Sequence, residues 1–275
     1  MGNFKEVLGI NDVSSPKSAS LVSKALLAEF LGNFLLNFFG CGSVVVMVST
    51  AAENKPNFLL VAITFGLVIF TSVQALGHVS GAHLNPAVTS GLFSIGKINL
   101  IKALLYIVAQ CVGATAGSAT LKALLPENWH ESGLGNTGLN PHLTPLQGFG
   151  FEFFLGFVLV LVVCGVCDAN RPEAKAAGPL AIGLTVALGH MGTINFTGAS
   201  MNPARSFGSA LIAGGWNNHW IYWIGPIAGA IVAAQLYENF LKAPKIIEAT
   251  IVERYRTVAD EKELKRLDVT KDNFA

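Results

Sequence analysis

The chain has 275 residues, of which 52% are apolar and only 13% are charged, and its formal net charge is +1. An ordinary soluble domain carries roughly a quarter charged residues, and the mean hydropathy here is high, at +0.53. The composition excludes an ordinary soluble globular domain, and the near-neutral charge gives no indication of a nucleic-acid partner.

Six apolar runs follow one another along the chain, and each is long enough to cross a membrane, which takes roughly 20 helical residues. Three of them contain no Asp, Glu, Lys or Arg, which is the strongest form of the transmembrane signal. Residues 1–16 lack the apolar core and cleavage site of a signal peptide, so the first run is expected to direct its own insertion. The predicted spans are about 25–48, 58–76, 103–121, 146–167, 176–194 and 220–241.

Positive charges gather on one side of these spans. Lys and Arg number three before the first span, two in 96–102, two in 171–175 and eight after 241, against one in 49–57 and none in 125–145. The positive-inside rule therefore predicts that both termini are cytoplasmic. The Gly- and Pro-containing segment 125–145 is predicted to be an extracellular loop. The charged tail, 243–275, is predicted to be flexible or weakly helical.

The sequence contains an internal repeat, because several motifs recur at a nearly constant spacing. Each half, about 22–124 and 146–242, holds three predicted spans and one Asn-Pro-Ala. Since three is odd, the second half must enter the membrane from the opposite side, and such inverted repeats place their site near the midplane. The matching pairs are Glu29 with Glu152, Gly66 with Gly183, Asn85-Pro86-Ala87 with Asn202-Pro203-Ala204, Gly91 with Gly208, and Tyr106 with Tyr222.

A short apolar stretch follows each Asn-Pro-Ala, at 87–95 and 204–213. At about 1.5 Å per residue, each covers only half of a bilayer. Asn is a preferred N-cap and Pro a preferred first helical residue, so both motifs are predicted to begin half-helices. In an inverted repeat the two N-termini face each other, each with about +0.5 of a charge, and oppose cations and protons. The free amide NH₂ groups of Asn85 and Asn202 are expected to donate into the lumen.

Two segments, His78–Val88 and Met201–Ser206, resemble the signatures of the aquaporin, or major intrinsic protein, family. The resemblance covers about residues 22–242. Over this range the sequence is similar to those of animal water channels, including insect ones. It implies an all-α membrane protein with a right-handed bundle of six transmembrane helices, two re-entrant half-helices and one pore per subunit. It also implies a homotetramer in the plasma membrane, without enzyme activity, cofactor, metal or nucleic-acid partner.

The resemblance further implies a selectivity filter formed by Phe65, His190, Ala199 and Arg205. The large Phe65 and His190 leave a water-sized gap, whereas glycerol-conducting relatives usually have a smaller residue at the His position. Ala199 stands where several water channels have Cys, so this filter is expected to lack a mercury-reactive thiol. Arg205 indicates function even without the family, because Arg within a membrane costs roughly 2.5 to 3.5 kcal/mol or more.

The intramembrane carboxylates Glu29 and Glu152 have two interpretations. Ionisable residues in spans are often functional, which would suggest a proton relay. The resemblance implies instead that they are buried acceptors which hold the loops before the two Asn-Pro-Ala motifs. The four cysteines all fall in predicted spans, so a disulfide framework is not expected.

Passive water conduction is the function that these features favour. Two alternatives remain open from the sequence: a broader facilitator that also passes glycerol, urea or peroxide, and a junctional or structural membrane protein with a poorly conducting pore.

Overall fold

The computed structural model describes residues 7–9, 15–49, 57–244 and 260–263. The chain divides into two compact units, Met1–Lys242 and Ala243–Ala275. The second unit is described only at 243–244 and over the short helical stretch 260–263. Most of the two predicted tails, 1–21 and 243–275, therefore lies outside the described residues.

The first unit is a bundle of long helices, and its described residues include no strand. Among the described residues, five helices are long and apolar enough to cross a membrane. The sixth predicted span is a helix of 16 residues that continues into a π-helical turn. The long helices are α3 (Pro16–Leu35), which continues through the π-helix η1 (Leu36–Cys41) into α4 (Gly42–Ser49), then α5 (Phe58–Ser80), α7 (Leu100–Leu124), α8 (Pro145–Val166), α10 (Gly178–Thr197) and α12 (Ile221–Leu236), with η3 (Tyr237–Leu241).

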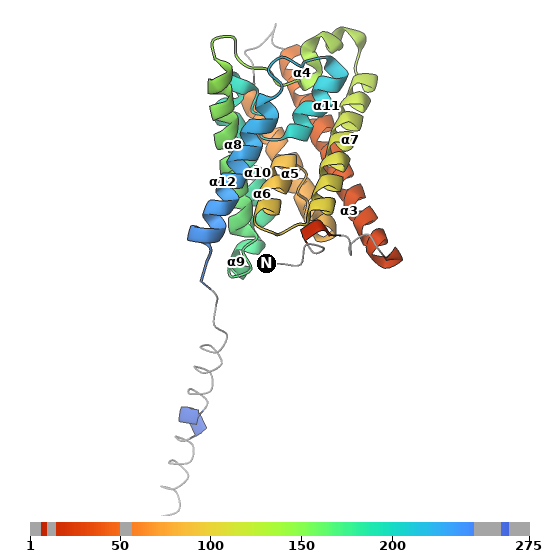
Figure 1. Cartoon of the computed structure of the whole chain (residues 1–275). Coiled ribbons are helices and arrows are strands. Elements are labelled where there is room, and N and C mark those ends of the chain that lie inside the picture. Colours follow the sequence, from red (N-terminus) through yellow and green to blue (C-terminus); the bar gives the residue numbers. More distant parts are fainter. Residues whose placement is uncertain (1–6, 10–14, 50–56, 245–259, 264–275) are drawn as a thin grey trace, which may run out of the picture. The chain divides into compact units, whose positions relative to one another are not determined.

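Two short helices, α6 (Pro86–Ser94) and α11 (Pro203–Ala213), begin at the two Asn-Pro-Ala motifs as predicted. The Asn85 side chain caps α6 by accepting from the Ala87 N–H, and the Asn202 side chain accepts from the N–H groups of Ala204 and Arg205. Figure 1 shows α6 and α11 in opposite halves of the bundle. The structure thus has the inverted half-helices that the repeat predicts.

The glycines that recur in the repeat mark close approaches between helices. Helices α5 and α10 cross at Gly66 and Gly183, where an added Cβ on either would lie 2.7 or 2.6 Å from the other's carbonyl oxygen. Gly91 brings α6 against Ala230 of α12, and Gly208 brings α11 against the Ala114 backbone of α7. Each half-helix is therefore packed closely against a long helix of the opposite repeat, at a glycine that leaves little room for a larger residue.

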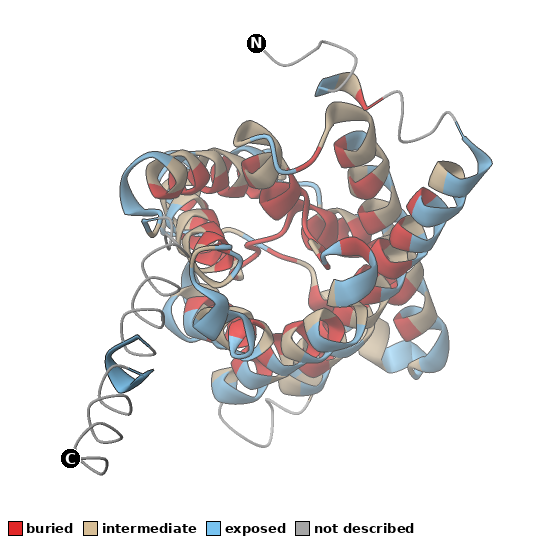
Figure 2. Cartoon of the chain, turned by 90° about the horizontal axis from the view of Figure 1, so that it is seen from below, coloured by how far each residue is buried: buried red, intermediate tan, exposed pale blue. Residues whose placement is uncertain are grey.

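The burial pattern is the one expected of a protein surrounded by lipid. Figure 2 shows the helices end-on as a ring in which the buried residues face inward. Large apolar residues remain exposed on the outer faces of the helices, which hydrocarbon rather than water would cover. Examples are Leu27 at 57%, Val108 at 60%, Leu188 at 59% and Phe240 at 79% exposed.

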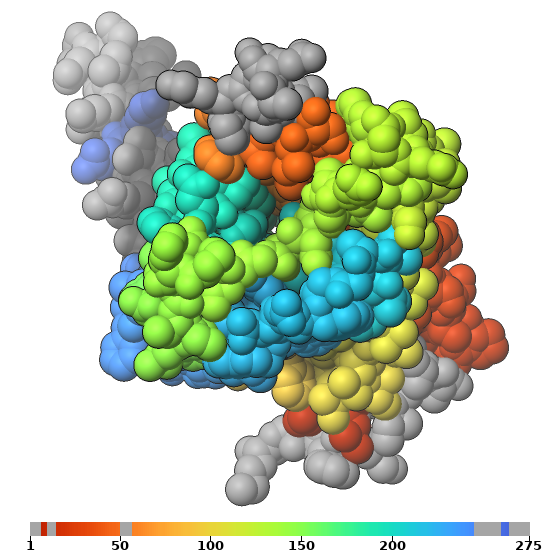
Figure 3. Space-filling view, turned by 90° about the horizontal axis from the view of Figure 1, so that it is seen from above, coloured from red at the N-terminus to blue at the C-terminus, as the bar shows by residue number. Residues whose placement is uncertain are grey.

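The predicted loop 125–145 is more ordered than a plain connection. It contains the 3₁₀ segment η2 (Glu127–Gly135), whose Leu134 is buried in a cluster with Cys41, Val45 and Leu121. Figure 3 shows this segment, in green, beside the region after α11, in blue, with the face hollowed where they meet. On the opposite end of the bundle, the short helix α9 (Pro172–Lys175) lies between α8 and α10.

Candidate functional site

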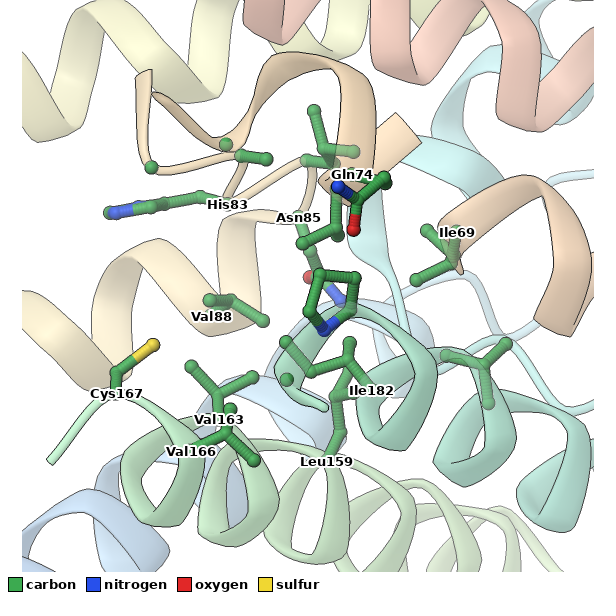
Figure 4. A pocket seen from close by; sticks show the side chains of 18 of the residues that line it. Ile69, Gln74, His83, Asn85, Val88, Leu159, Val163, Val166, Cys167 and Ile182 are labelled. Atoms are coloured by element: carbon green, nitrogen blue, oxygen red, sulfur yellow. The ribbon is translucent and has the colours of Figure 1, made fainter. Parts of the chain in front are cut away.

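A cavity of about 880 Å³ enters the bundle at the α9 end and extends to Phe65, His190 and Arg205. Aliphatic side chains from α5, α8 and α10 line much of its wall, while the segments before α6 and α11 supply polar groups. Figure 4 shows His83 and Asn85 across the cavity from Leu159 and Val163. The lining therefore has an apolar side and a polar side, with both Asn-Pro-Ala motifs on the polar one.

The two asparagines tie the repeats together at the middle of this cavity. The Asn85 amide nitrogen donates to the Met201 carbonyl at 2.8 Å, and the Asn202 amide nitrogen donates to the Leu84 carbonyl at 2.7 Å. One amide hydrogen of each Asn is thus used in a contact that the sequence analysis did not foresee. Because an NH₂ group has two hydrogens, only one on each Asn is left for the lumen.

The segments before both half-helices adopt an unusual backbone. Ala82, Leu84, Ala199 and Met201, none of them glycine, have φ between 46° and 57°. Such left-handed conformations are uncommon outside glycine, and they gather at functional sites where the surroundings hold them. The same alternation occurs in both repeats, so the two segments have matching shapes on opposite sides of the midplane.

The buried carboxylates hold these strained segments. Glu152 accepts hydrogen bonds from the Thr197 hydroxyl at 2.6 Å and from the N–H groups of Ser200 and Met201 at 2.9 Å. Glu29 accepts from four donors in the matching places of the first repeat and on α7. They are the Ser80 hydroxyl, the N–H groups of His83 and Leu84, and the Gln110 amide. Each carboxylate accepts from the segment before the half-helix of its own repeat, as an anchor of that segment requires.

Three of the four predicted filter residues meet at the inner end of the cavity. The rings of Phe65 and His190 stack with centroids 4.3 Å apart, and the Arg205 guanidinium carbon lies 5.0 Å from the Phe65 ring centroid. All three side chains line the cavity and are 98% or more buried. Ala199 is also fully buried, but it is not among the lining residues. Its place in the filter stays a prediction.

Two nitrogens at this constriction have no hydrogen-bond partner among the described residues, namely His190 Nε2 and Arg205 Nε. His190 Nδ1 donates to the Val186 carbonyl at 2.9 Å, and this hydrogen bond fixes the orientation of the ring. Arg205 also donates to the Ser209 hydroxyl at 3.4 Å. Because buried polar atoms nearly always have a partner, these two nitrogens indicate a place for a small hydrogen-bonding molecule.

Asn37, in the π-helix η1, also supports the filter, although its sequence context did not predict this role. Its amide nitrogen donates to the Arg205 carbonyl at 3.1 Å and to the Ser118 hydroxyl at 2.9 Å. π-Helical turns are rare and often occur at functional sites. The available signal was a polar residue inside an apolar run, but its partner lies in the other repeat and could not be identified from the spacing.

We expect Asn37→Leu to disturb the filter more than Asn33→Leu. Asn33 is an equally buried asparagine on the same helix, yet its amide donates only to the Glu29 carbonyl one turn away. Loss of the Asn37 amide removes its hydrogen bonds to the Arg205 carbonyl and the Ser118 hydroxyl, at a cost of about 0.5–1.5 kcal/mol each. Thermal unfolding in detergent and water flux in proteoliposomes measure the effect. Equal losses in both variants would contradict a specific role for Asn37.

Comparison with known proteins gives consistent matches. The Major intrinsic protein family matches residues 16–237. Aquaporin-4 of Mus musculus is 44% identical over 78% of this chain and 66% of its own length, so this chain spans slightly less than two thirds of that relative. Aquaporin FA-CHIP of Pelophylax lessonae is 42% identical, with 82% of this chain and 85% of that protein covered. Aquaporin-1 of Canis lupus familiaris is 41% identical, covering 86% and 89%.

The fold also matches a solved structure. The X-ray structure of the aquaglyceroporin from Plasmodium falciparum superposes with a TM-score of 0.72 and 27% identity, covering 80% of this chain and 97% of that one. Together with the bundle and its two half-helices, this confirms the all-helical membrane fold predicted from the sequence.

Proposed function

The chain belongs to the major intrinsic protein family, and we propose that it is a passive water channel whose cavity holds back protons and ions. The proteins that it matches are channels and not enzymes, so no covalent chemistry is assigned to it. The observation that carries the proposal is the constriction. Stacked Phe65 and His190 narrow the passage at a point where His190 Nε2 and Arg205 Nε have no hydrogen-bond partner in the described part of the chain.

At the proposed filter, a water molecule replaces part of its hydration with contacts to these two nitrogens. The neighbouring Phe65 ring offers no hydrogen bond and limits the width. Arg205 carries a fixed positive charge, so a cation or a hydronium ion is repelled at the same place. A larger solute such as glycerol is excluded because Phe65 and His190 occupy the space that it needs.

A second barrier follows at the paired half-helices. The N-termini of α6 and α11 start at Asn85 and Asn202, and each contributes about half a positive charge. The one remaining hydrogen on each Asn amide donates to a passing water, which then accepts from both sides and cannot relay a proton onward. Glu29 and Glu152 hold the flanking loops in the shape that keeps these donors in place.

We also propose an orientation in the membrane, the limits of the channel domain and an assembly for this protein. The chain is an integral membrane protein with several spans. The distribution of Lys and Arg supports cytoplasmic termini, in which case the α9 end of the cavity opens to the cytoplasm. We place residues 22–242 as the channel domain, the tails 1–21 and 243–275 outside it, and the protein as a homotetramer in the plasma membrane with one pore per subunit.

Stopped-flow measurements on proteoliposomes test the function directly. Rapid osmotic water flux without glycerol flux is the expected result. Flux of both solutes would support the broader facilitator instead, a comparison made relevant by the structural match to an aquaglyceroporin. Absence of any flux above empty liposomes would contradict conduction and support the structural alternative.

Mercury sensitivity tests the placement of Ala199. Of the four cysteines, Cys167 is exposed and lines the cavity, Cys41 and Cys164 are buried, and the half-buried Cys111 is not a lining residue. We therefore use a Cys167→Ser background, in which mercurial is expected to leave water flux unchanged. Adding Ala199→Cys is expected to create a block that a reducing thiol reverses. If flux in the double variant stays insensitive, Ala199 does not border the water path.

A further inference from the structure

A second crevice, of about 510 Å³, lies on the outer surface at the end of the bundle where α3 and α7 begin and α5 ends. It is shallow and open, and His78 lines both this crevice and the edge of the pore cavity. The proposed water path does not use its other residues. The lining residues are Ser18, Leu21, Val22, Lys24, Ala25, His78, Val79 and Lys102.

The charge of this crevice is one-sided. Lys24 from α3 and Lys102 from α7 line it together, and no Asp or Glu is among the described residues that line it. Neither lysine forms an ion pair within the described residues, although Lys102 Nζ lies 5.5 Å from the Tyr106 ring centroid. Arg171 and Lys242, at the same end of the chain's spans, instead pair with Glu173 and Glu238. Within the part of the chain that the structure describes, the crevice therefore offers two cations without a neutralising carboxylate.

The local backbone adds to the positive field. Helix α3 begins at Pro16 and α7 begins at Leu100, so Ser18 and Lys102 each occupy the third position of a helix. The N–H groups of Ser18 and Lys102 already donate to the capping side chains of Ser15 and Asn99, so the two helix starts attract an anion through their partial charge. The Ser18 hydroxyl accepts a hydrogen bond from Ser15 at 2.8 Å, which leaves its own hydrogen available to donate.

The surroundings of the crevice are apolar and exposed. Leu21 on α3 and Val79 on α5, which line it, are 59% and 39% exposed. A soluble anion would leave these side chains uncovered. An anion that carries acyl chains would cover them while its charged group sits between the lysines.

From this juxtaposition we infer that the crevice binds the phosphate group of an anionic phospholipid from the leaflet around the starts of α3 and α7. The inference goes beyond water conduction and depends only on the chain's place in a membrane. Basic residues near an anionic membrane surface contribute about 1 kcal/mol each, so each lysine should account for about a fivefold change in affinity.

Native mass spectrometry of the full-length protein in neutral detergent, titrated with phosphatidylglycerol or phosphatidylcholine, tests this site. The test variant is Lys24→Gln/Lys102→Gln, and each single variant is measured as well. The matched control, Lys97→Gln/Lys242→Gln, removes two charges at the same end of the spans from residues outside the crevice. Water flux in phosphatidylcholine liposomes should be unchanged in all of them, which shows that the variants fold.

The expected result is that the test variant binds phosphatidylglycerol about 25-fold more weakly, while the control and all phosphatidylcholine affinities stay as in the wild type. Glycerol phosphate, added as a soluble competitor at the lipid concentration, should fail to displace the lipid. Equal binding by test variant and wild type would overturn the proposal, and so would an equal loss in the control. Full displacement by glycerol phosphate would identify a free phosphate as the ligand and overturn the lipid assignment.

Discussion

Replacing Glu152 by leucine is expected to remove most of the folded protein. The substitution leaves three buried donors without an acceptor, namely the Thr197 hydroxyl and the N–H groups of Ser200 and Met201. At about 1–3 kcal/mol for each unsatisfied group, the loss is about 3–9 kcal/mol. That is comparable with the whole stability of an ordinary domain, about 5–15 kcal/mol.

The backbone makes this loss harder to avoid by local relaxation. Ala199 and Met201 are held at positive φ, next to or at the backbone N–H groups of Ser200 and Met201 that donate to Glu152. Without the carboxylate, their backbone is free to return to ordinary conformations, and the Met201 carbonyl then moves away from the Asn85 amide. The yield of monodisperse protein in size-exclusion chromatography measures the effect. Glu29→Leu removes the carboxylate that accepts from four donors, and it is expected to lower the yield at least as much.

Glu152→Gln separates anchoring from a proton relay. Glutamine has nearly the same shape and keeps one acceptor oxygen, so the anchoring role predicts an intermediate yield with water flux retained. A relay would be lost equally in Glu152→Gln and Glu152→Leu, with the fold intact in both. Wild-type yield for Glu152→Leu would contradict the anchoring role.

The sequence predicted the architecture well because that architecture depends on local and repeated signals. Apolar runs located the spans, and Asn-Pro at positions 85–86 and 202–203 marked the start of α6 and α11. The first span was placed too late, at 25 instead of Pro16. Hydropathy detects the residues that lie in hydrocarbon. Helix α3 starts before that region, in a stretch that carries Lys17 and Lys24.

The parts that sequence reasoning missed depend on contacts between the repeats. The Asn85 amide reaches the carbonyl of Met201, and the Asn37 amide reaches that of Arg205, and each bond joins one repeat to the other. Neither contact leaves a periodic pattern, because each is a single hydrogen bond between distant segments. The π-helix that carries Asn37 was missed as well, because the partners of its Asn37 side chain lie on α7 and α11, far along the chain.

At the filter, His190→Ala is expected to admit glycerol or urea while protons remain excluded. The change removes the ring that stacks on Phe65 and so widens the narrowest part of the cavity. The half-helices and the amides of Asn85 and Asn202 are untouched, so the second barrier stays in place. Leu159→Ala is the matched control, because it also removes a side chain that lines the cavity but leaves the stacked rings of Phe65 and His190 in place.

Combining His190→Ala with Arg205→Val is expected to introduce a leak of cations or protons. A unit charge about 4 Å away costs a cation about 4 kcal/mol at an effective dielectric constant of about 20, which is about a thousandfold in its occupancy. The barrier that remains comes from the two half-helix ends, with about half a charge each. Since the two barriers act in series, removing one shows how much the other supplies.

Glycerol swelling and pH-dependent current in oocytes, with surface expression measured for each variant, distinguish the two contributions. The single variant should gain solute flux without current, whereas the double variant should gain both. Proton current already present in His190→Ala would mean that the half-helix barrier is weak, because Arg205 is still there. If His190→Ala reaches the membrane normally and changes neither solute nor water flux, His190 does not form the constriction, despite its stacking on Phe65 and its free Nε2.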